Sequence, residues 1–338
     1  MKIGSTRVFV MLGRLGPQRA RVSAETRPDR PKGLHTKSGS LPADAAGMEN
    51  DNENKPMQMS QALFTSKLLV VSDVLCLFLV SIPFLASELK AVRPYRRGFS
   101  CGDPSIAYPY LLSEVIPDTL LIAAGILIAG LVVVVGECYR VRLLGVSTKS
   151  FVRNKYVSCL YKEFGAFLFG CFVGQSLTNT AKLSVGRLRP HFLSVCGVTY
   201  TSLNCTEGTY LESVSCPSTD HRSIEEARKS FFSGHASFAM YTMLYLAFYL
   251  QARLTWRKAR LLRPVLQFFL FLLAIYTGLT RVTDNRHHPS DVVFGYIIGA
   301  FTAYWVAFYI SSMFKRPSLN QSPIETQDNQ LPAQHSIC

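Results

Sequence analysis

Six long runs of apolar residues dominate the chain, and stretches rich in polar and charged residues separate them. Each run is close to the roughly 20 residues that a helix needs to cross a bilayer. The runs are continuous and do not alternate between apolar and polar positions, which favours helices over the strands of a membrane barrel. The pattern predicts an all-α polytopic membrane protein with six transmembrane helices. The runs are Lys67–Ser87, Ile116–Gly136, Leu160–Leu177, Phe232–Gln251, Val265–Thr280 and Val292–Met313.

Two of the six runs are weaker than the others. The run Leu160–Leu177 contains Lys162 and Glu163, and the run Val265–Thr280 is short unless its helix extends back into Leu261–Arg263. Composition supports the membrane interpretation, because 48% of the residues are hydrophobic and only 17% are charged. A soluble core would not require six apolar runs of this length and spacing.

The chain before the first run has a different composition. Met1–Gly47 contains nine Lys and Arg against three Asp and Glu, with scattered Pro, Gly and Ser. We expect residues 1–60 to form a disordered cytosolic tail, residues 61–315 a six-helix membrane domain, and residues 316–338 a second disordered tail. The first tail supplies much of the formal net charge of +14. That charge therefore suits an anionic membrane surface and does not indicate a nucleic-acid partner.

Basic residues in short loops indicate the orientation, because Lys and Arg concentrate on the cytoplasmic side of a membrane. The loops after the second and fourth runs are basic, as is the stretch after the last run, which places both termini in the cytoplasm. The loop between the first two runs disagrees, since it carries four cations on the predicted outer side. The cytoplasmic set is Arg140, Arg142, Lys149, Arg153, Lys155, Arg253, Arg257, Lys258, Arg260, Arg263, Lys315 and Arg316, and the disagreeing set is Lys90, Arg93, Arg96 and Arg97.

Two further features of the predicted outer side outweigh the contrary evidence from the charge of that loop. Asn204-Cys205-Thr206 is an acceptor sequence for N-glycosylation in the longest loop. The outer side also carries four cysteines, an even number suited to an oxidising compartment. They are Cys101, Cys196, Cys205 and Cys216. Four cysteines allow three pairings, and the sequence does not choose among them.

The first of three polar clusters, Lys182-x6-Arg189-Pro190, follows the third run. If the helix continues through Thr180–Arg189, the two cations are seven residues apart and share one face, and Pro190 ends the helix. Arg offers a planar fork to phosphate oxygens and Lys a point charge. The alternative is a basic flank that anchors the span at the membrane surface. Its position on the outer side, against the charge rule, favours the phosphate interpretation.

The second cluster, Ser233-Gly234-His235, opens the fourth run. Ser233 is a favourable N-cap, and glycine allows a ligand to approach the backbone closely. The N–H groups of Gly234 and His235 would then face an anion at the helix N-terminus. The alternative is a capped helix with an interfacial histidine.

The third cluster, Arg281-x5-His287-x3-Asp291, joins the fifth and sixth runs. Pro289 suits the first turn of the sixth helix, and Asp291 falls in that same turn. Its carboxylate could accept a proton from His287, leaving the other ring nitrogen free to attack. The alternative is an acid that stabilises a helix start beside a polar loop.

An even number of spans between the clusters brings all three to one face of the membrane. Together they supply three cations, a hydroxyl, two imidazoles and a carboxylate, which is the chemistry of a membrane-embedded phosphatase working at the lipid–water boundary. No set of metal ligands stands out on the outer side, so we expect the fixed cations to do the work of a metal, with no cofactor. Two other classes remain: a non-catalytic membrane interaction protein on the same scaffold, and a polytopic transporter. Transporter charges lie near mid-span, whereas these lie at span ends.

The three clusters resemble the tripartite signature of the type 2 phosphatidic acid phosphatase superfamily, written KX6RP, PSGH and SRX5HX3D. Two positions differ, because Phe232 stands in place of proline and Thr280 in place of serine. The stretches Gly186–Leu193 and Tyr249–Arg253 are similar to the lipid phosphate phosphatases, also called phospholipid phosphatases, and Ser230–Phe238 most closely to their type 3 branch. The resemblance covers about Phe64 to Phe314.

This resemblance implies a Mg²⁺-independent phosphohydrolase that forms a phosphohistidine intermediate. His287 would be the nucleophile, His235 the acid and base, and Asp291 the group that orients His287. The implied phosphate-binding residues are Lys182, Arg189, Ser233, Gly234 and Arg281. Implied substrates are phosphatidic acid, lysophosphatidic acid, sphingosine 1-phosphate and ceramide 1-phosphate. We expect a plasma-membrane glycoprotein modified at Asn204, with its active site facing the extracellular or lumenal side, and a homo-oligomer is left open.

Overall fold

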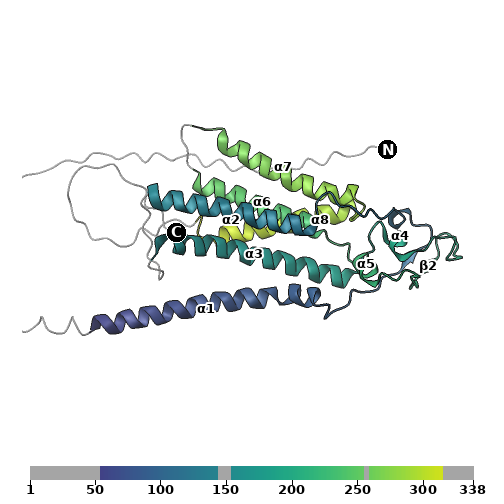
Figure 1. Ribbon diagram of the computed structural model, residues 1–338, viewed down its shortest axis with the longest axis horizontal. Helices are drawn as coiled ribbons and strands as arrows, with labels where there is room; N and C mark the ends of the chain where they lie inside the picture. The colour runs from purple at the N-terminus through teal and green to yellow at the C-terminus, as the bar shows by residue number, and fades with distance from the viewer. Residues whose placement is uncertain (1–53, 144–153, 255–258, 315–338) are drawn as a thin grey trace, which may run out of the picture. The chain divides into compact units, whose positions relative to one another are not determined.

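The computed structural model describes residues 54–143, 154–254 and 259–314. Long helices run side by side, and the short elements gather at one end of them (Figure 1). The long helices are α1 (Asn54–Glu88), α2 (Asp118–Leu143), α3 (Lys155–Val185), α6 (Gly234–Arg253), α7 (Leu262–Thr283) and α8 (Pro289–Trp305), which continues as the π-helix η2 (Val306–Ile310). The short elements are β1 (Phe99–Ser100), the 3-10 helix η1 (Pro104–Ile106), α4 (Phe192–Cys196), β2 (Tyr210–Leu211) and α5 (His221–Glu226).

The predicted all-α polytopic membrane fold is confirmed. Within the described part of the chain, five helices are long and apolar enough to cross a membrane. They are Lys67–Glu88, Asp118–Leu143, Tyr156–Val185, Leu262–Thr283 and Pro289–Ile310. The predicted run Phe232–Gln251 forms α6 but is not among the five. Most of α6 is buried inside the protein, so its surface need not be apolar, and its role as a sixth span stays a prediction.

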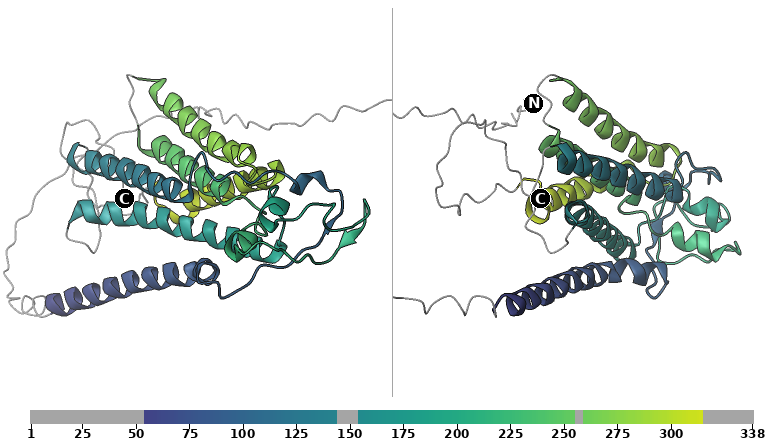
Figure 2. Two further views of the ribbon diagram at one scale, coloured as in Figure 1. Left: turned by 45° about the vertical axis from the view of Figure 1, so that its right-hand side comes forward. Right: turned by 60° about the vertical axis from the view of Figure 1, so that its left-hand side comes forward.

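Helix α6 lies at the centre of the bundle and packs against α2, α3, α7 and α8. Helix α1 packs against α3, and Figure 2 shows α1 and α7 on opposite sides of the bundle. Three tyrosines on α6, spaced four residues apart, share one face and donate hydrogen bonds to neighbouring helices. Tyr241, Tyr245 and Tyr249 donate to the carbonyl oxygen of Phe167 (2.7 Å), the carbonyl oxygen of Glu163 (2.9 Å) and the carboxylate of Glu137 (3.0 Å). Buried hydroxyls thus find acceptors that lipid could not offer.

Two glycines bring α8 against the start of α6. A Cβ atom at Gly295 would lie 2.7 Å from the carbonyl oxygen of Ser233, and a Cβ atom at Gly299 would overlap the carbonyl oxygen of Ser237. Small residues four positions apart allow two membrane helices to pack closely. This contact fixes the N-terminus of α6 beside the N-terminus of α8, where two of the polar clusters lie.

The charges that weaken the third run are explained by a buried ion network at the far end of the bundle. Glu163 is fully buried, and its Oε1 accepts a hydrogen bond of 2.9 Å from Arg253, in the last turn of α6. Ser311 and Ser312 donate to the same carboxylate at 3.2 and 3.0 Å. The network therefore ties α3, α6 and the end of η2 together, so Glu163 is compatible with a helix inside the membrane domain.

We expect Glu163→Ala to destabilise the fold strongly. Removing one partner of a buried ion pair costs about 3–5 kcal/mol, and here it leaves Arg253 with only Glu137, 3.5 Å away and already paired with Arg140. Thermal denaturation of the purified protein in detergent should show a markedly lower midpoint. Arg142→Gln removes an exposed charge near the end of α2; it should change the free energy of unfolding by no more than about 0.5 kcal/mol and leave the midpoint nearly unchanged. Equal midpoints for both variants would contradict a stabilising role for Glu163.

Several helix boundaries differ from those of the predicted runs, and two of the differences bear on the predictions above. Helix α1 begins at Asn54, inside the predicted tail 1–60, because Gln and Met favour helix without forming an apolar run. Helix α7 begins at Leu262, so the fifth run does extend back. The other predicted tail residues, 1–53 and 316–338, lie outside the described residues, as do the basic positions 149, 153, 257, 258 and 315.

Two disulfides and a short sheet stabilise the loops at the end of the bundle that carries α4 and α5. Strands β1 and β2 pair antiparallel, and the disulfides join Cys101 to Cys205 and Cys196 to Cys216. This selects one of the three pairings that the sequence allows. Asn204, exposed and with a positive φ of 49°, stands in the turn beside the first disulfide.

Candidate active site

All three polar clusters meet at the end of the bundle that carries the disulfide-linked loops. Lys182 lies in the last turn of α3. A Cβ atom at Gly234, the first residue of α6, would lie 3.4 Å from its ammonium nitrogen. The backbone N–H of Ser233 donates to the carbonyl oxygen of Asp291 at 3.0 Å. The predicted convergence of the clusters on one end is therefore seen directly.

Arg189 does not share a helix with Lys182, contrary to the predicted continuous helix through Thr180–Arg189. Helix α3 ends at Val185, because Gly186 adopts the left-handed conformation with a φ of 59° and caps it. A side chain at Gly186 would also collide with the backbone of Tyr95. Arg189 instead lies in the connection to α4, where its backbone N–H donates to the carbonyl oxygen of Ala227 at 2.8 Å.

A carboxylate that the sequence did not reveal stands beside Arg189. Glu226, the last residue of α5, lies 3.7 Å from the Arg189 guanidinium and accepts a hydrogen bond of 2.9 Å from Lys229. Burial raises the pKa of Glu226, but the hydrogen bond from Lys229 and the charge of Arg189 together hold it below its usual value. Glu226 is therefore an anion that balances the basic side chains on this flank of the site.

The start of α6 supplies backbone N–H groups, as predicted. Ser233 is the N-cap, and its hydroxyl accepts from the N–H of Ala236 at 3.4 Å. The first-turn N–H groups of a helix have no acceptor within it and carry the positive end of the helix dipole. With the Lys182 ammonium alongside Gly234, this turn is suited to an anion.

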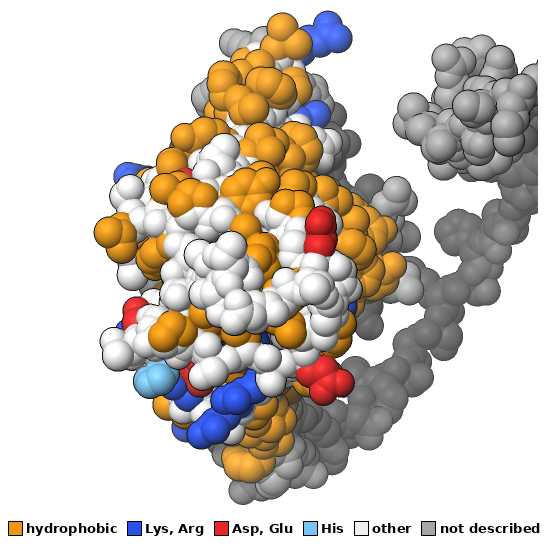
Figure 3. Space-filling model, turned by 90° about the vertical axis from the view of Figure 1, so that its right-hand side faces the viewer, with side chains coloured by type: hydrophobic (Ala, Val, Ile, Leu, Met, Phe, Trp, Pro, Cys, Tyr) orange, Lys and Arg blue, Asp and Glu red, His pale blue; other side chains and the backbone are white. Residues whose placement is uncertain are grey.

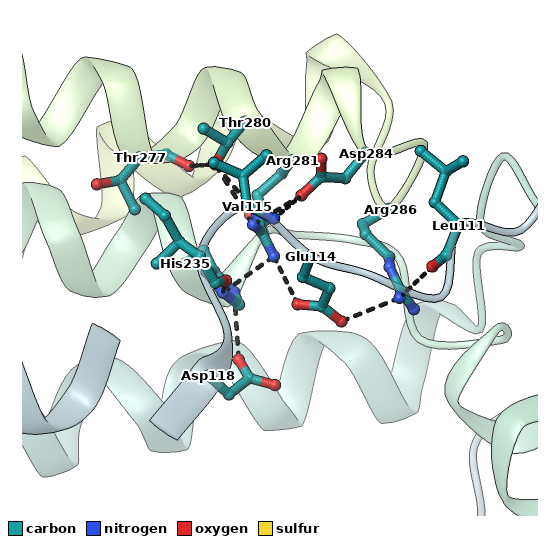
Figure 4. A network of polar contacts seen from close by, with 12 residues as sticks. Leu111, Glu114, Val115, Asp118, His235, Thr277, Thr280, Arg281, Asp284 and Arg286 are labelled. Carbon is teal, nitrogen blue, oxygen red and sulfur yellow. Dashed lines mark hydrogen bonds and ion pairs between the residues drawn. The ribbon is translucent and has the colours of Figure 1, made fainter. Parts of the chain in front are cut away.

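Arg281 is buried among acids that the sequence did not single out (Figure 4). Its side chain is 1% exposed, and its guanidinium donates to Glu114 at 2.8 Å and to Asp284 at 2.9 Å. Glu114 also lies 3.1 Å from Arg286. Two carboxylates thus hold Arg281 in one orientation. Thr280, which replaces the serine of the written pattern, donates its hydroxyl to the carbonyl oxygen of Thr277 at 2.7 Å.

His235 lies between the carboxylate of Asp118 and the guanidinium of Arg281 (Figure 4). Its Nδ1 is 3.2 Å from the carboxylate of Asp118, the first residue of α2, and its Nε2 is 3.1 Å from Arg281 and 3.0 Å from the carbonyl oxygen of Ile116. Asp118 stabilises a proton on the ring, whereas Arg281 opposes a second positive charge. The imidazole can therefore gain and lose a proton in place.

His287 lies in the α7–α8 loop and is 4% exposed. Burial lowers its pKa, and the nearby charges of Arg189 and Lys182 lower it further, against the opposing effect of Asp291. The ring is therefore neutral at pH 7, the form that can attack phosphorus. Its Nδ1 is buried, 3.9 Å from Asp291 Oδ2, too far for a hydrogen bond.

Asp291 accepts hydrogen bonds from three other groups. Pro289 begins α8 and Asp291 falls in its first turn, as predicted. Arg187 donates to one carboxylate oxygen at 2.6 Å, while the Ser230 hydroxyl and the backbone N–H of His288 donate to the other at 2.6 and 3.1 Å. Sequence reasoning missed Arg187 and Ser230 as partners, because both come from loops distant in sequence. They fix the carboxylate beside His287.

No group of three or more His, Cys, Asp and Glu side chains within 54–143, 154–254 and 259–314 is arranged to hold a metal ion. Cationic side chains gather in the site. They are Lys182, Arg187, Arg189, Arg281 and Arg286.

Comparison with known proteins adds to this picture. The model of the PAP2 superfamily matches residues 163–315, which contain all three clusters. Phospholipid phosphatase 1 of Rattus norvegicus is 45% identical over 262 residues, covering 78% of this chain and 92% of that protein. Phospholipid phosphatase 2 of Homo sapiens is 48% identical over 250 residues, covering 73% of this chain and 84% of that protein. No solved structure matches. The similarity to the type 3 branch stays a prediction. With its three clusters and this identity along most of its length, the chain belongs to the PAP2 superfamily, among the phospholipid phosphatases.

Proposed function

We propose that this protein is a lipid phosphate phosphatase that hydrolyses phosphomonoesters at the membrane surface without Mg²⁺. The observation that carries the proposal is the meeting of fixed cations with two imidazoles at one end of an apolar bundle. Lys182 and Arg281 lie on either side of the α6 N-terminus, and His287 lies beside Asp291. The relatives named above are phosphatases of phospholipids, which supports the same activity here.

The phosphoryl oxygens would be held by Lys182, Arg189 and Arg281 together with the N–H groups at the start of α6. Glu114, Asp284 and Glu226 hold the arginines in place before a substrate arrives. Groups fixed in this way stabilise the charge that builds on the phosphoryl oxygens without reorganising during the reaction.

In the first step, a ring nitrogen of neutral His287 attacks the phosphorus atom. The bond between phosphorus and the lipid oxygen breaks, and protonated His235 gives its proton to that oxygen, releasing an alcohol. Asp291 compensates the positive charge that develops on His287. The products of this step are the dephosphorylated lipid and a phosphohistidine.

In the second step, His235 takes a proton from a water molecule, which attacks the phosphohistidine. The bond between nitrogen and phosphorus breaks, inorganic phosphate leaves, and His287 returns to its neutral form. The proton held by His235 is then available for the next turnover. Asp118 beside Nδ1 supports the protonated state, so one residue serves as both acid and base.

The position of the site at the helix ends indicates the substrate class. A headgroup can reach it from the membrane surface while its acyl or sphingoid chain stays in the bilayer. Phosphatidic acid, lysophosphatidic acid, sphingosine 1-phosphate and ceramide 1-phosphate all meet this requirement. The test is phosphate release from phosphatidic acid in mixed micelles containing EDTA. We expect full turnover there, and a requirement for added Mg²⁺ would contradict the proposal.

We further propose that the active site faces the extracellular or lumenal side, in the plasma membrane. Both disulfides and the sequon lie at the same end of the bundle as the site, and disulfides persist in oxidising compartments. Asn204→Gln is therefore expected to abolish an endoglycosidase-sensitive mass shift. Intact cells should also hydrolyse lysophosphatidic acid supplied outside. An unchanged mass, with an epitope after Phe314 accessible without permeabilisation, would reverse this orientation.

A further inference from the structure

A cavity of about 250 Å³ lies beside the active site, and the proposed chemistry does not use it. Its walls come from the loop after α1 and from α5, and Ser87, in the last turn of α1, forms part of the rim. Because the span Lys67–Glu88 ends there, the cavity lies at the level of the membrane surface. It is thus open to groups carried on lipids.

The lining of this cavity is strongly basic. Its charged side chains include four cations and one carboxylate, and a histidine adds hydrogen-bonding capacity. They are Lys90, Arg93, His221, Arg222, Glu225 and Lys229. Figure 3, which views this end of the molecule, shows Lys and Arg side chains gathered toward one edge of that face. Two of the cations, Lys90 and Arg93, belong to the loop that disagrees with the charge rule for membrane topology.

Lys90 occupies a backbone conformation that glycine would adopt more easily. Its φ is 55°, and the hydrogen bonds Lys90 N–H to Ser87 and Ala91 N–H to Ala86 form the helix-ending motif in which glycine is usual. A non-glycine residue in the left-handed region costs about 1–2 kcal/mol. Glycine would end the helix with less strain than lysine. The lysine is therefore explained if its charge binds a ligand in the cavity.

The cavity is also linked to the catalytic cations. Lys229 lines it and donates to Glu226, which lies 3.7 Å from Arg189. An anion in the cavity would compete with Glu226 for Lys229. The carboxylate of Glu226, paired with both side chains, therefore lies between Lys229 of the cavity and Arg189 of the phosphate-binding set.

We propose that this cavity binds the phosphate headgroup of an anionic membrane lipid, at a site distinct from the one around His287. Arg93 and Arg222 supply planar forks to phosphate oxygens, and Lys90 supplies a point charge. The membrane-level position favours a lipid over a soluble anion, because the acyl chains stay in the bilayer beside α1. This proposal does not depend on the phosphatase activity.

Spin-labelled phosphatidylglycerol is the probe, since it is a phosphodiester and offers no phosphomonoester to hydrolyse. The full-length protein in phosphatidylcholine vesicles should immobilise this lipid several-fold more than spin-labelled phosphatidylcholine. The double variant Arg93→Gln/Arg222→Gln should lose that selectivity. Arg96→Gln removes an exposed charge from the same loop outside the cavity and should keep it. Equal losses in both would mean diffuse attraction to the basic loop and would overturn the proposal.

Lys90→Gly provides a second variant that should fold at least as well as the parent. Glycine relieves the left-handed backbone, so we expect a thermal midpoint that is equal or higher, together with weaker selectivity for phosphatidylglycerol. Unchanged selectivity would remove Lys90 from the site and contradict the explanation of its conformation. Inorganic phosphate or heparin is added in a separate arm. Displacement of the lipid by micromolar amounts of either would assign the cavity to a soluble anion and overturn the lipid assignment.

Discussion

Replacing His287 by alanine is expected to abolish phosphate release from phosphatidic acid in EDTA. The loss should be at least a thousandfold, or about 4 kcal/mol in the activation barrier. The reason is that His287 is the neutral, buried imidazole beside Asp291 and is proposed to attack phosphorus. Initial rates of purified protein in mixed micelles measure the effect.

The matched control for that variant is His221→Ala, which removes an exposed histidine from the first turn of α5. It should retain the parent rate, and both variants should show the parent's thermal midpoint within a few degrees. Residual activity within about tenfold of the parent, roughly 1.4 kcal/mol, would show that His287 is not the nucleophile.

Replacing His235 by glutamine is expected to lower turnover of phosphatidic acid by about 10²–10⁴-fold. The expected loss depends on the leaving group, because His235 is proposed to protonate the departing oxygen. An aryl phosphate releases a phenolate, which needs less protonation than an alkoxide. The rate of the first step on 4-methylumbelliferyl phosphate should therefore fall much less in this variant. Because the second step stays slow, a burst of fluorescent product should appear.

His287→Ala serves as the comparison for His235→Gln, since loss of the nucleophile should abolish release from both substrates. The proposed roles would be contradicted if His235→Gln lost the aryl burst as completely as the lipid turnover. They would be exchanged if His235→Gln abolished both reactions and His287→Ala kept the burst. Comparing the lipid and aryl substrates therefore shows which histidine is the nucleophile and which is the acid.

Hydropathy predicts much of this fold because helix surfaces that face lipid have to be apolar. Five of the six apolar runs appear as helices that can span the membrane. Helix α6 is the informative exception, since burial among four other helices permits the hydroxyls of Tyr241, Tyr245 and Tyr249 on its surface. The pairing Cys101–Cys205 was beyond prediction, because it depends on how loops far apart in the sequence fold.

The candidate site was predicted where its signal is local, and missed where it depends on contacts between loops. Ser233 as N-cap and Asp291 in the first turn of α8 follow from helix-capping preferences. The helix considered for Thr180–Arg189 does not form, because Gly186 ends α3 before Pro190 can, so Arg189 and Lys182 do not share a helix face. Glu114 could not be assigned to Arg281, since 167 residues separate them and acids have no spacing signal of their own.

The most direct test of the account is chemical trapping of the intermediate. Wild-type protein is mixed with ³²P-labelled phosphatidic acid in EDTA, quenched within one turnover, and digested for peptide mapping. We predict an alkali-stable, acid-labile phosphate on the peptide that contains His287, present in the wild-type protein and missing from His287→Ala. Label on a different residue, or no covalent label from a fully active enzyme under a quench fast enough to catch one turnover, would contradict it.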